Sequence, residues 1–337
     1  MMRYDRQIKL SEVGSSGQEK LKNASVLIVG VGGLGCPAAQ YLVGAGIGKI
    51  GLMDHDRVSI TNLHRQVLFG ELDVGKSKVF VAKEKLQQLN AEIELIAIDE
   101  ALGHENAQKI FLDFDIILDG TDNFETKYLI NDACVLTDKP WVYASVYKNE
   151  GQISVFNYED GPSYRCLFPI TTKQNISCES TGVLGVTPGL LGILQATEII
   201  KMILGRGSVL SGKLKLINVM QGTEQILTIQ KRPEEIEKVK LQGIIPERLN
   251  CELKIKTKVY LDVREEFEQP EVHSENVIHI PLSNLRDRFN EIPVKDEVWV
   301  FCRSGVRSAK AIDLLKRDFG LQNLKNVEGG LETIING

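Results

Sequence analysis

The chain has 337 residues, of which 43% are hydrophobic and 25% are charged, and its formal net charge is −5. This length suits two domains, the composition excludes a disordered protein, and the negative charge excludes a broad basic surface for nucleic acid. The six cysteines form no CxxC pair, which argues against a disulfide framework and a self-evident zinc site.

The N-terminus, "MMRYDRQIKL", is polar and contains no apolar signal region. The longest apolar stretch, 182–204, contains Pro188, Gln195, Glu198 and Lys201, whereas a membrane span needs about 20 mostly apolar residues. We therefore expect a buried helix in a cytoplasmic protein with neither a membrane nor a nucleic acid as its partner.

Strand-like and helix-like patterns alternate from residue 25 to residue 147, with helical stretches such as 75–90 and 124–137. The short apolar runs predict strands at 25–30, 49–54, 93–98, 115–119 and 141–146. Such alternation predicts an α/β fold with a Rossmann-like, mostly parallel sheet. Later runs predict an antiparallel extension of that sheet, at 152–158, 214–219 and 224–230.

The charged segment "QKRPEEIEKVKLQG" (230–243) interrupts this pattern and predicts a solvated linker or a peripheral helix. We expect a first domain at 1–230, a linker at 231–250 and a second, smaller α/β domain at 251–337. The strand-like runs "KVYLDV", "VIHIPL" and "EVWVF" belong to that second domain, and roughly 85 residues suffice for a small core.

The segment "GVGGLG" follows the first predicted strand and opens a helix. Its Gly30, Gly32 and Gly35 fit G-x-G-x-x-G, and Asp54 closes the next strand, 19 residues after Gly35. Glycines allow the backbone to approach a phosphate, the helix N-terminus supplies N–H donors, and the acidic residue accepts ribose hydroxyls. The pattern predicts a bound nucleotide of unspecified kind. The alternative is that these glycines serve only helix–strand packing.

Further polar residues follow this nucleotide signature. Asn62, Arg65 and Gln66 lie in "DHDRVSITNLHRQVLF", and Lys76 and Lys78 lie in "DVGKSK". Cations that converge with a carboxylate suit a nucleoside triphosphate with magnesium better than a nicotinamide.

The required carboxylates are found in "DGTDN", which places Asp119 and Asp122 at the end of the fourth predicted strand, where open α/β sheets bind ligands. Plainer interpretations remain open. Arg65 and Lys78 can be surface charges, and Asp122 or Asn123 can cap the following helix.

Five ordered motifs, "RYDRQI", "GVGGLG", "DHDRVSITNLHRQ", "VGKSK" and "DGTDN", resemble those of the ThiF/MoeB/HesA family over roughly residues 1–230. These adenylyltransferases are similar to ubiquitin-activating enzymes. The resemblance implies that ATP and Mg²⁺ adenylate the C-terminal Gly-Gly carboxylate of a ubiquitin-fold sulfur-carrier protein. It also implies a homodimer in which Arg6 reaches into the site of the partner subunit.

Matching positions carry the expected roles onto this sequence. The resemblance implies that Asp54 binds the ribose, that Asn62, Arg65 and Lys78 bind phosphates, and that Asp122 holds magnesium. The expected nucleotide-binding residues are Gly30, Gly32, Gly33, Gly35, Asp54, Asp56, Asn62, Arg65, Gln66, Lys78, Asp122 and Asn123.

The chain departs from the family at its structural zinc site, which relatives often build from two CxxC pairs. The "CYRC"-like segment reads "SYRC" here, with Ser163 in place of a cysteine and Cys166 retained. The second pair is absent. Because tetrahedral zinc needs four ligands, we expect no zinc.

Cys178, in "NISCESTGVLG", falls where relatives place a cysteine on a mobile loop over the C-terminus of the carrier. In some relatives this cysteine bonds covalently to the carrier, so Cys178 is a candidate catalytic residue. The alternative is an incidental thiol.

Cys302 is the second candidate nucleophile. A predicted strand, 298–301, delivers it to the loop "CRSGVR", and a helix is expected to begin near Ser308. Backbone N–H groups, the helix dipole, Arg303 and Arg307 would favour a thiolate, since such surroundings lower the pKa of cysteine to about 3.5–7.5. The cradle suits a persulfide or a phosphate, and the alternative is a packed structural thiol.

"CRSGVRS", with "YLDVRE" upstream and "VEGGL" downstream, resembles a single rhodanese domain over about 251–337. A six-residue loop favours sulfur over phosphate, because dual-specificity phosphatases use a loop one residue longer. Asp262 and Arg264 are expected to form a buried ion pair or a turn cap. The resemblance implies a persulfide loop of Cys302, Arg303, Ser304, Gly305, Val306 and Arg307.

The two halves together predict one reaction sequence. A Cys302 persulfide would attack the carrier acyl-adenylate and expel AMP, and reductive cleavage would then leave a thiocarboxylate, with Cys178 as a possible resolving thiol. The carrier would be of the molybdopterin-synthase or thiamine type, and the sulfur donor a cysteine desulfurase or thiosulfate. Two alternatives stay open: a non-catalytic nucleotide-binding scaffold and an NAD-dependent oxidoreductase.

Overall fold

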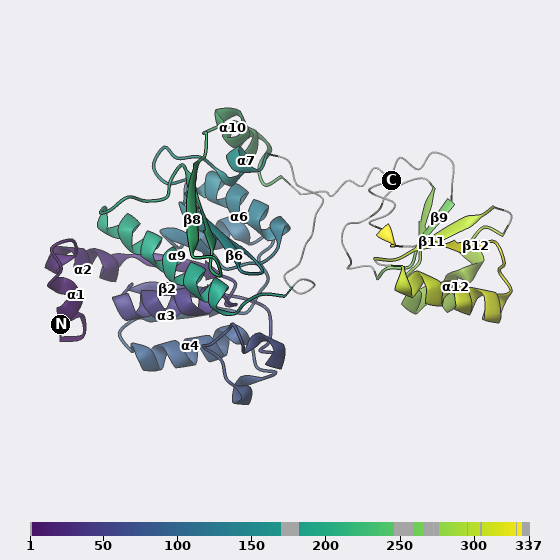
Figure 1. Cartoon of the computed structure of the whole chain (residues 1–337), viewed down its shortest axis with the longest axis horizontal. Helices are drawn as coiled ribbons and strands as arrows, with labels where there is room; N and C mark the ends of the chain where they lie inside the picture. The colour runs from purple at the N-terminus through teal and green to yellow at the C-terminus, as the bar shows by residue number, and fades with distance from the viewer. Residues whose placement is uncertain are drawn as a thin grey trace. The chain divides into compact units, whose positions relative to one another are not determined.

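A computed structural model of the chain resolves two compact units, Met1–Glu247 and Arg248–Gly337 (Figure 1). The described residues are 2–169, 182–245, 259–265, 268, 272, 276–294, 296–303, 305–327 and 329–331.

The first unit is built on an eight-stranded sheet with the order β3-β2-β1-β4-β5-β6-β7-β8. The pairs from β3 to β5 are parallel, and those from β5 to β8 are antiparallel. The predicted Rossmann-like sheet and its extension are therefore confirmed. The strands are β1 (Ser25–Val29), β2 (Lys49–Met53), β3 (Glu94–Ile98), β4 (Ile116–Asp119), β5 (Trp141–Tyr147), β6 (Glu150–Phe156), β7 (Lys213–Asn218) and β8 (Thr223–Thr228).

Helices cover both faces of this sheet, so its central strands are apolar on both sides. Val26 and Ile28 of β1 face one core, and Leu27 and Val29 face the other. The first core lies under α3 (Gly35–Ala45), α4 (Lys78–Leu89) and α9 (Val186–Leu204). The second lies under α5 (Ala107–Phe111), α6 (Phe124–Thr137), α7 (Tyr164–Leu167) and α10 (Pro233–Gln242) (Figure 1). The remaining helical elements are η1 (Met2–Tyr4), α1 (Asp5–Ile8), α2 (Gly14–Asn23), η2 (Ile60–Asn62) and η3 (Glu71–Asp73).

Helix α9 coincides with the longest apolar stretch of the sequence. Its length and composition alone would let it cross a membrane, but half of its apolar window is buried, and it packs against α3, β5 and β6. Gln195 within it is fully buried and donates to the carbonyl oxygens of Asp119 (2.7 Å) and Val142 (3.0 Å). The predicted buried helix is confirmed, and a polar side chain joins it to the sheet.

The segment predicted as a linker, 231–250, contains α10, which packs against α6 and α7. Val239 of α10 is fully buried, and the N–H of Ile245 donates to Oδ2 of Asp132 (3.0 Å). The structure therefore assigns residues up to 247 to the first unit, whereas we expected that unit to end at residue 230. Residues 246–258 lie outside the described part of the chain.

The second unit has a four-stranded, parallel sheet with the order β10-β9-β11-β12. Its core includes Leu261, Val300 and Leu315, and the predicted small α/β fold is confirmed. The elements are β9 (Val259–Asp262), β10 (Val277–His279), η4 (Leu282–Asn284), α11 (Leu285–Arg288), η5 (Phe289–Glu291), β11 (Val298–Phe301), α12 (Val306–Phe319) and β12 (Leu324–Asn326).

Candidate functional site

The glycine-rich turn joins β1 to α3 at the carboxyl edge of the parallel strands. Gly30 has a φ of +89°, and a Cβ there would lie 2.8 Å from the backbone of Gly120. A Cβ on Gly35 would lie 2.0 Å from the carbonyl oxygen of Gly30, so the fold itself requires both glycines. A Cβ on Gly32 would meet only Nε2 of Gln66, at 3.6 Å. Gly32 therefore leaves open space in front of the turn.

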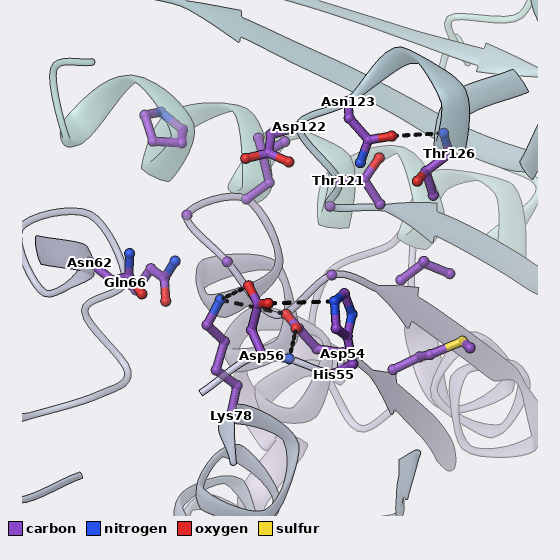
Figure 2. Close-up of a pocket in the computed structure, with 18 of the residues that line it drawn as sticks. Asp54, His55, Asp56, Asn62, Gln66, Lys78, Thr121, Asp122, Asn123 and Thr126 are labelled. Atoms are coloured by element: carbon purple, nitrogen blue, oxygen red, sulfur yellow. Dashed lines mark hydrogen bonds and ion pairs between the residues drawn. The ribbon is translucent and has the colours of Figure 1, made fainter. Parts of the chain in front are cut away.

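That space belongs to a cavity of about 300 Å³ (Figure 2). The structure brings all of the predicted nucleotide-binding residues to its wall except Gly35, which packs behind the turn. The predicted residues on the wall are Gly30, Gly32, Gly33, Asp54, Asp56, Asn62, Arg65, Gln66, Lys78, Asp122 and Asn123.

Lys78, the first residue of α4, lies among carboxylates on one wall of this cavity (Figure 2). Its Nζ is 2.7 Å from Oδ2 of Asp56 and 4.0 Å from Oδ2 of Asp54, and the residue is 4% exposed. Asp54 also accepts from the N–H groups of Val31 (2.8 Å) and Asp56 (2.9 Å), which ties the end of β2 to the glycine-rich turn. Lys78 therefore belongs to the site and is not a surface charge.

A second wall comes from η2 and the turn that follows it. Oδ1 of Asn62 accepts from the N–H of Ser59 (3.3 Å), and Nη1 of Arg65 donates to the carbonyl oxygen of Thr61 (3.0 Å). Gln66 is buried, and its Oε1 has no hydrogen-bond partner among the residues that the structure describes. A buried, unpaired amide oxygen beside a cavity suits a ligand that brings a donor.

The turn after β4 is anchored by Asp119, which is fully buried. Oδ2 of Asp119 accepts from Nζ of Lys127 (2.7 Å), and its Oδ1 accepts from Oγ1 of Thr121 (2.6 Å). Asp119 is therefore a structural residue that fixes the shape of this turn. Sequence reasoning missed Lys127, which reads as one more helix residue.

Asp122 and Asn123 have separate tasks in this turn. Oδ1 of Asn123 accepts from the N–H of Thr126 (2.8 Å), so Asn123 is the cap of α6. Asp122 is exposed on the cavity wall, and its carboxylate forms no hydrogen bond or ion pair within the described ranges. It is free to bind a ligand or a metal ion.

Two other residues predicted to be catalytic in the first domain are Arg6 and Cys178. Arg6 is exposed on α1 and does not line the cavity, and Cys178 lies outside the described residues. Burial raises the pKa of Cys36 to about 12 and also raises the pKa of Cys134. Both of these thiols are structural, because a nucleophile needs the thiolate.

Cys166, the cysteine retained from the zinc-binding pattern of the family, is buried in protein contacts. Its Sγ lies 3.4 Å from the backbone N of Ser163 and 3.3 Å from that of Arg232. The neighbouring Arg165 makes two hydrogen bonds to Asp132, of 2.7 and 2.8 Å. Direct contacts between α6, α7 and the segment around α10 therefore hold this region together.

In the second unit, Cys302 follows β11 and is 1% exposed. Its Sγ accepts from the N–H of Gly305 (3.2 Å), and Oγ of Ser308 lies 3.5 Å away. Helix α12 begins at Val306, slightly earlier than expected, and Ser304 lies outside the described residues. An N–H aimed at the sulfur stabilises a thiolate or a persulfide. Ser308, which was not among the predicted donors, can add its hydroxyl only in competition with the carbonyl oxygen of Gly305, 3.0 Å from its Oγ.

The two arginines of the Cys302 loop differ in exposure and in ion pairing. Arg303 is exposed, whereas Arg307 forms a bidentate ion pair with Glu268, with 2.6 Å between Nη2 and Oε2. Its hydrogen bonds lower the pKa of Glu268 to about 2. The pKa of Arg307 is raised, chiefly by Glu268 and to a smaller extent by the charge of Cys302. Glu268 therefore offsets the charge of Arg307, which the sequence did not indicate.

Asp262 and Arg264 form a buried pair at the end of β9. Nη2 of Arg264 lies 2.6 Å from Oδ2 of Asp262, and its backbone N–H donates to Oδ1 (3.0 Å). Both expected features, the ion pair and the turn cap, are present in the same two residues. Their role is structural.

The nucleotide-suited cavity comes first along the chain and the Cys302 loop second, and comparisons with known proteins give the same order of domains. Residues 4–238 match the model of the ThiF family. The chain belongs to the ThiF family. Residues 246–336 match the model of the Rhodanese-like domain, so this ThiF-family chain carries a second domain of the kind that its sequence predicts.

Curated relatives of this ThiF-family chain are named as adenylyltransferases, some of them also as sulfurtransferases. "Adenylyltransferase and sulfurtransferase MOCS3" of Danio rerio is 36% identical over 98% of this chain and 84% of its own length. "Sulfur carrier protein adenylyltransferase" of Thermus thermophilus is 45% identical over 68% of this chain and 88% of its own length. The MOCS3 of Aedes aegypti is 50% identical over 68% of this chain, and that match spans about half of the relative, 53%.

Among solved structures, E. coli MccB with ATP matches with a TM-score of 0.61 and 28% sequence identity. The match covers 68% of this chain and 72% of MccB. A ThiF-family fold with an ATP-bound counterpart is consistent with a nucleotide in the cavity at the glycine-rich turn.

Proposed function

We propose that this ThiF-family chain adenylates the C-terminal Gly-Gly carboxylate of a ubiquitin-fold sulfur-carrier protein and then supplies the sulfur that replaces AMP. The observation that carries the proposal is the presence, in one chain, of a phosphate-suited cavity around Gly32 and Lys78 and a sulfur cradle around Cys302. The names of the Danio rerio and Thermus thermophilus relatives support it. A scaffold or an NAD-dependent oxidoreductase is not favoured.

In the first step, a carboxylate oxygen of the carrier attacks the α-phosphorus of ATP, and the bond to pyrophosphate breaks. A carboxylate is already ionised at pH 7, so the site needs no general base, and positioning with charge neutralisation carries the catalysis. Gly32 leaves room for the phosphates, and the cations of Lys78 and Arg65 face them.

Magnesium fits this cavity. The carboxylates on the wall outnumber the cations of Arg65 and Lys78, so a triphosphate would be repelled unless a divalent cation came with it. Asp122, exposed and unengaged within the described ranges, is the proposed ligand. When bound, Mg²⁺ would neutralise phosphate charge. The carboxylates on the wall are those of Asp54, Asp56, Glu100 and Asp122.

The second unit supplies the sulfur. The terminal sulfur of a Cys302 persulfide attacks the acyl carbon of the adenylate, AMP leaves, and an acyl disulfide forms. A second thiol, which we propose to be Cys178, attacks Sγ of Cys302, so that the carrier leaves as a thiocarboxylate and a disulfide forms between the two cysteines. An external dithiol, or two thiols in turn, then reduces that disulfide and is itself oxidised to a disulfide.

The proposal extends to the assembly and its location. We expect a cytoplasmic homodimer in which Arg6 serves the cavity of the partner subunit, since Arg6 is exposed on α1 and lines no part of its own cavity. We also expect no structural zinc, because Ser163 replaces a cysteine beside Cys166 and the thiol of Cys166 is engaged by backbone groups.

ATP–pyrophosphate exchange tests the first step, with the small ubiquitin-fold proteins of the source organism that end in Gly-Gly added one at a time. Carriers of the molybdopterin-synthase type come first and those of the thiamine type second. Cys302→Ala should keep the exchange and lose formation of the thiocarboxylate, measured by mass spectrometry of the carrier. Absence of exchange with every carrier would overturn adenylation, and a thiocarboxylate formed by Cys302→Ala would overturn the sulfur step.

A further inference from the structure

The ion pair between Arg307 and Glu268 is the feature of the sulfur site that the proposed function does not use. The two terminal guanidinium nitrogens of Arg307 donate to Glu268, at 2.5 Å (Nη1 to Oε1) and 2.6 Å (Nη2 to Oε2). The N–H of Glu265 also donates to Oε1 of Glu268, at 2.8 Å, which fixes the carboxylate in place. The side chains are only 34% (Arg307) and 13% (Glu268) exposed, so water screens the pair less than a surface pair.

Among the described residues, the further charges near Cys302 add no excess of positive charge. Glu265 also acts on Arg307 electrostatically, and its carboxylate accepts from Oγ of Ser283 (2.8 Å). Asp262 and Arg264 neutralise each other. Arg303 is exposed. The loop thus carries two arginines in the sequence, and in the fold two glutamates, Glu268 and Glu265, act on one of them, Arg307.

This balance matters because sulfur donors differ in charge. Thiosulfate is a dianion: when the Cys302 thiolate attacks its outer sulfur, an S–S bond forms, the old S–S bond breaks, and sulfite leaves as a dianion with the electron pair. A persulfide donor is a monoanion: the same attack releases a thiolate and also leaves the persulfide on Cys302. The first encounter brings three negative charges together and the second brings two, so the first depends more on unopposed arginines.

We propose that Glu268 is a specificity-determining residue that disfavours dianionic sulfur donors and leaves the site suited to organic persulfides. The inference rests on the proposed function of Cys302 as the sulfur acceptor and selects between the donor classes. Glu268 acts by holding the guanidinium of Arg307 in a bidentate pair, so that an oxyanion donor must compete with a fixed carboxylate.

The test uses the full chain and measures the second-order rate of Cys302 persulfide formation by quenched mass spectrometry, with thiosulfate, a dianion, and with cysteine persulfide, whose net charge is −1. Glu268→Gln keeps the shape and the acceptor for the N–H of Glu265 but removes the charge. We expect the thiosulfate rate to rise about tenfold and the persulfide rate to change less than about twofold.

Two controls test whether the change in the thiosulfate rate comes from the release of Arg307 by Glu268→Gln. Glu291→Gln makes the same change of charge in the same unit, at an exposed ion pair with Arg288, and should leave both rates unchanged. The gain for thiosulfate should disappear in the double variant Glu268→Gln/Arg307→Gln, because the freed guanidinium is then absent. Thermal unfolding of each variant checks that the second unit is folded.

Equal changes for the two donors in Glu268→Gln, or no change for thiosulfate, would overturn the inference while leaving Cys302 as the sulfur acceptor. The persistence of the gain in the double variant would overturn it as well. If Cys302 of the unaltered chain accepts sulfur from neither donor, the proposed sulfur step itself fails. The two failures are therefore distinguishable.

Discussion

Nζ of Lys78 lies 2.7 Å from Oδ2 of Asp56, and the two side chains differ sharply in exposure, 6% for Lys78 and 56% for Asp56. The ammonium group is thus fixed in the wall of the cavity by a carboxylate that solvent reaches. Asp54 stands behind the pair, with its own oxygens engaged by backbone N–H groups. We expect phosphate oxygens to take the place of Asp56 as the partner of Lys78, which would turn a preformed ion pair into a binding site.

Replacing Lys78 by Met should reduce ATP–pyrophosphate exchange by about 10²–10³-fold, because it removes a preorganised charge that faces the reacting phosphates. The free energy of unfolding should change by no more than about 1 kcal/mol, since Asp56 can be solvated. Lys76→Met is the matched control, because Lys76 is exposed beside Asp73 and lines no part of the cavity. Equal losses of exchange in the two variants would contradict the role of Lys78.

The glycine-rich turn offers a second comparison. Gly32→Ala should fold with unchanged stability and bind ATP at least about tenfold more weakly, because its Cβ makes only an ordinary contact with Nε2 of Gln66 and otherwise enters the open cavity. Gly35→Ala should instead destabilise the first unit by about 1–3 kcal/mol, since its Cβ would overlap the carbonyl oxygen of Gly30. Denaturant unfolding and ATP titration separate the two effects, and ATP affinity that survives in Gly32→Ala would show that the phosphates bind elsewhere.

The sequence predicted those features that a short segment encodes. The apolar runs gave the strands, and Gly30, Asp54 and Asp122 each lie at the carboxyl end of a parallel strand, so their meeting at one edge followed from the fold class. The position of Cys302 in a loop after a strand was likewise predicted from a few consecutive residues. These predictions depend on a few consecutive residues and on the rule that strand ends share an edge.

The features that the sequence did not predict are pairings between distant segments. Glu268 is 39 residues from Arg307, and Gln195 reaches the carbonyl oxygen of Asp119, 76 residues away, from a helix whose burial was predicted but whose partners were not. The segment that forms α10 was interpreted as a solvated linker or a peripheral helix because its sequence is highly charged. In the fold, Val239 is the buried residue that attaches it to the first unit. Only the packed fold determines which charged groups meet.

Asp122 and Asn123 are adjacent, but we expect their replacement to affect different properties: exchange activity for Asp122 and stability for Asn123. Asp122→Ala should abolish measurable exchange and raise the Mg²⁺ concentration needed for ATP binding, with little effect on stability, because its carboxylate is exposed. Asn123→Ala should cost about 1 kcal/mol of stability through loss of the cap on α6. Exchange assays across a range of Mg²⁺ concentrations, together with unfolding curves, test both. A destabilised Asp122→Ala with normal exchange would remove Asp122 from the proposed magnesium site.

The region around Cys166, where we expect no zinc, should depend on a buried ion pair and not on a metal. Asp132 is fully buried and accepts from Arg165, from Nδ2 of Asn131 (2.9 Å) and from the N–H of Ile245 (3.0 Å). One carboxylate thus links α6 to α7 and to the segment that follows α10. Arg165→Met would leave this carboxylate buried and uncompensated, and we expect the first unit to lose about 3–5 kcal/mol.

The surface variant Lys240→Met is the control for that change. Lys240 pairs with Glu237 at an exposed site, so its loss should cost less than about 0.5 kcal/mol. Elemental analysis of the purified chain should find no stoichiometric zinc, and a chelator should leave the unfolding curve of the first unit unchanged. Stoichiometric zinc, or a chelator effect as large as that of Arg165→Met, would mean that ligands beyond the described residues complete a metal site with Cys166.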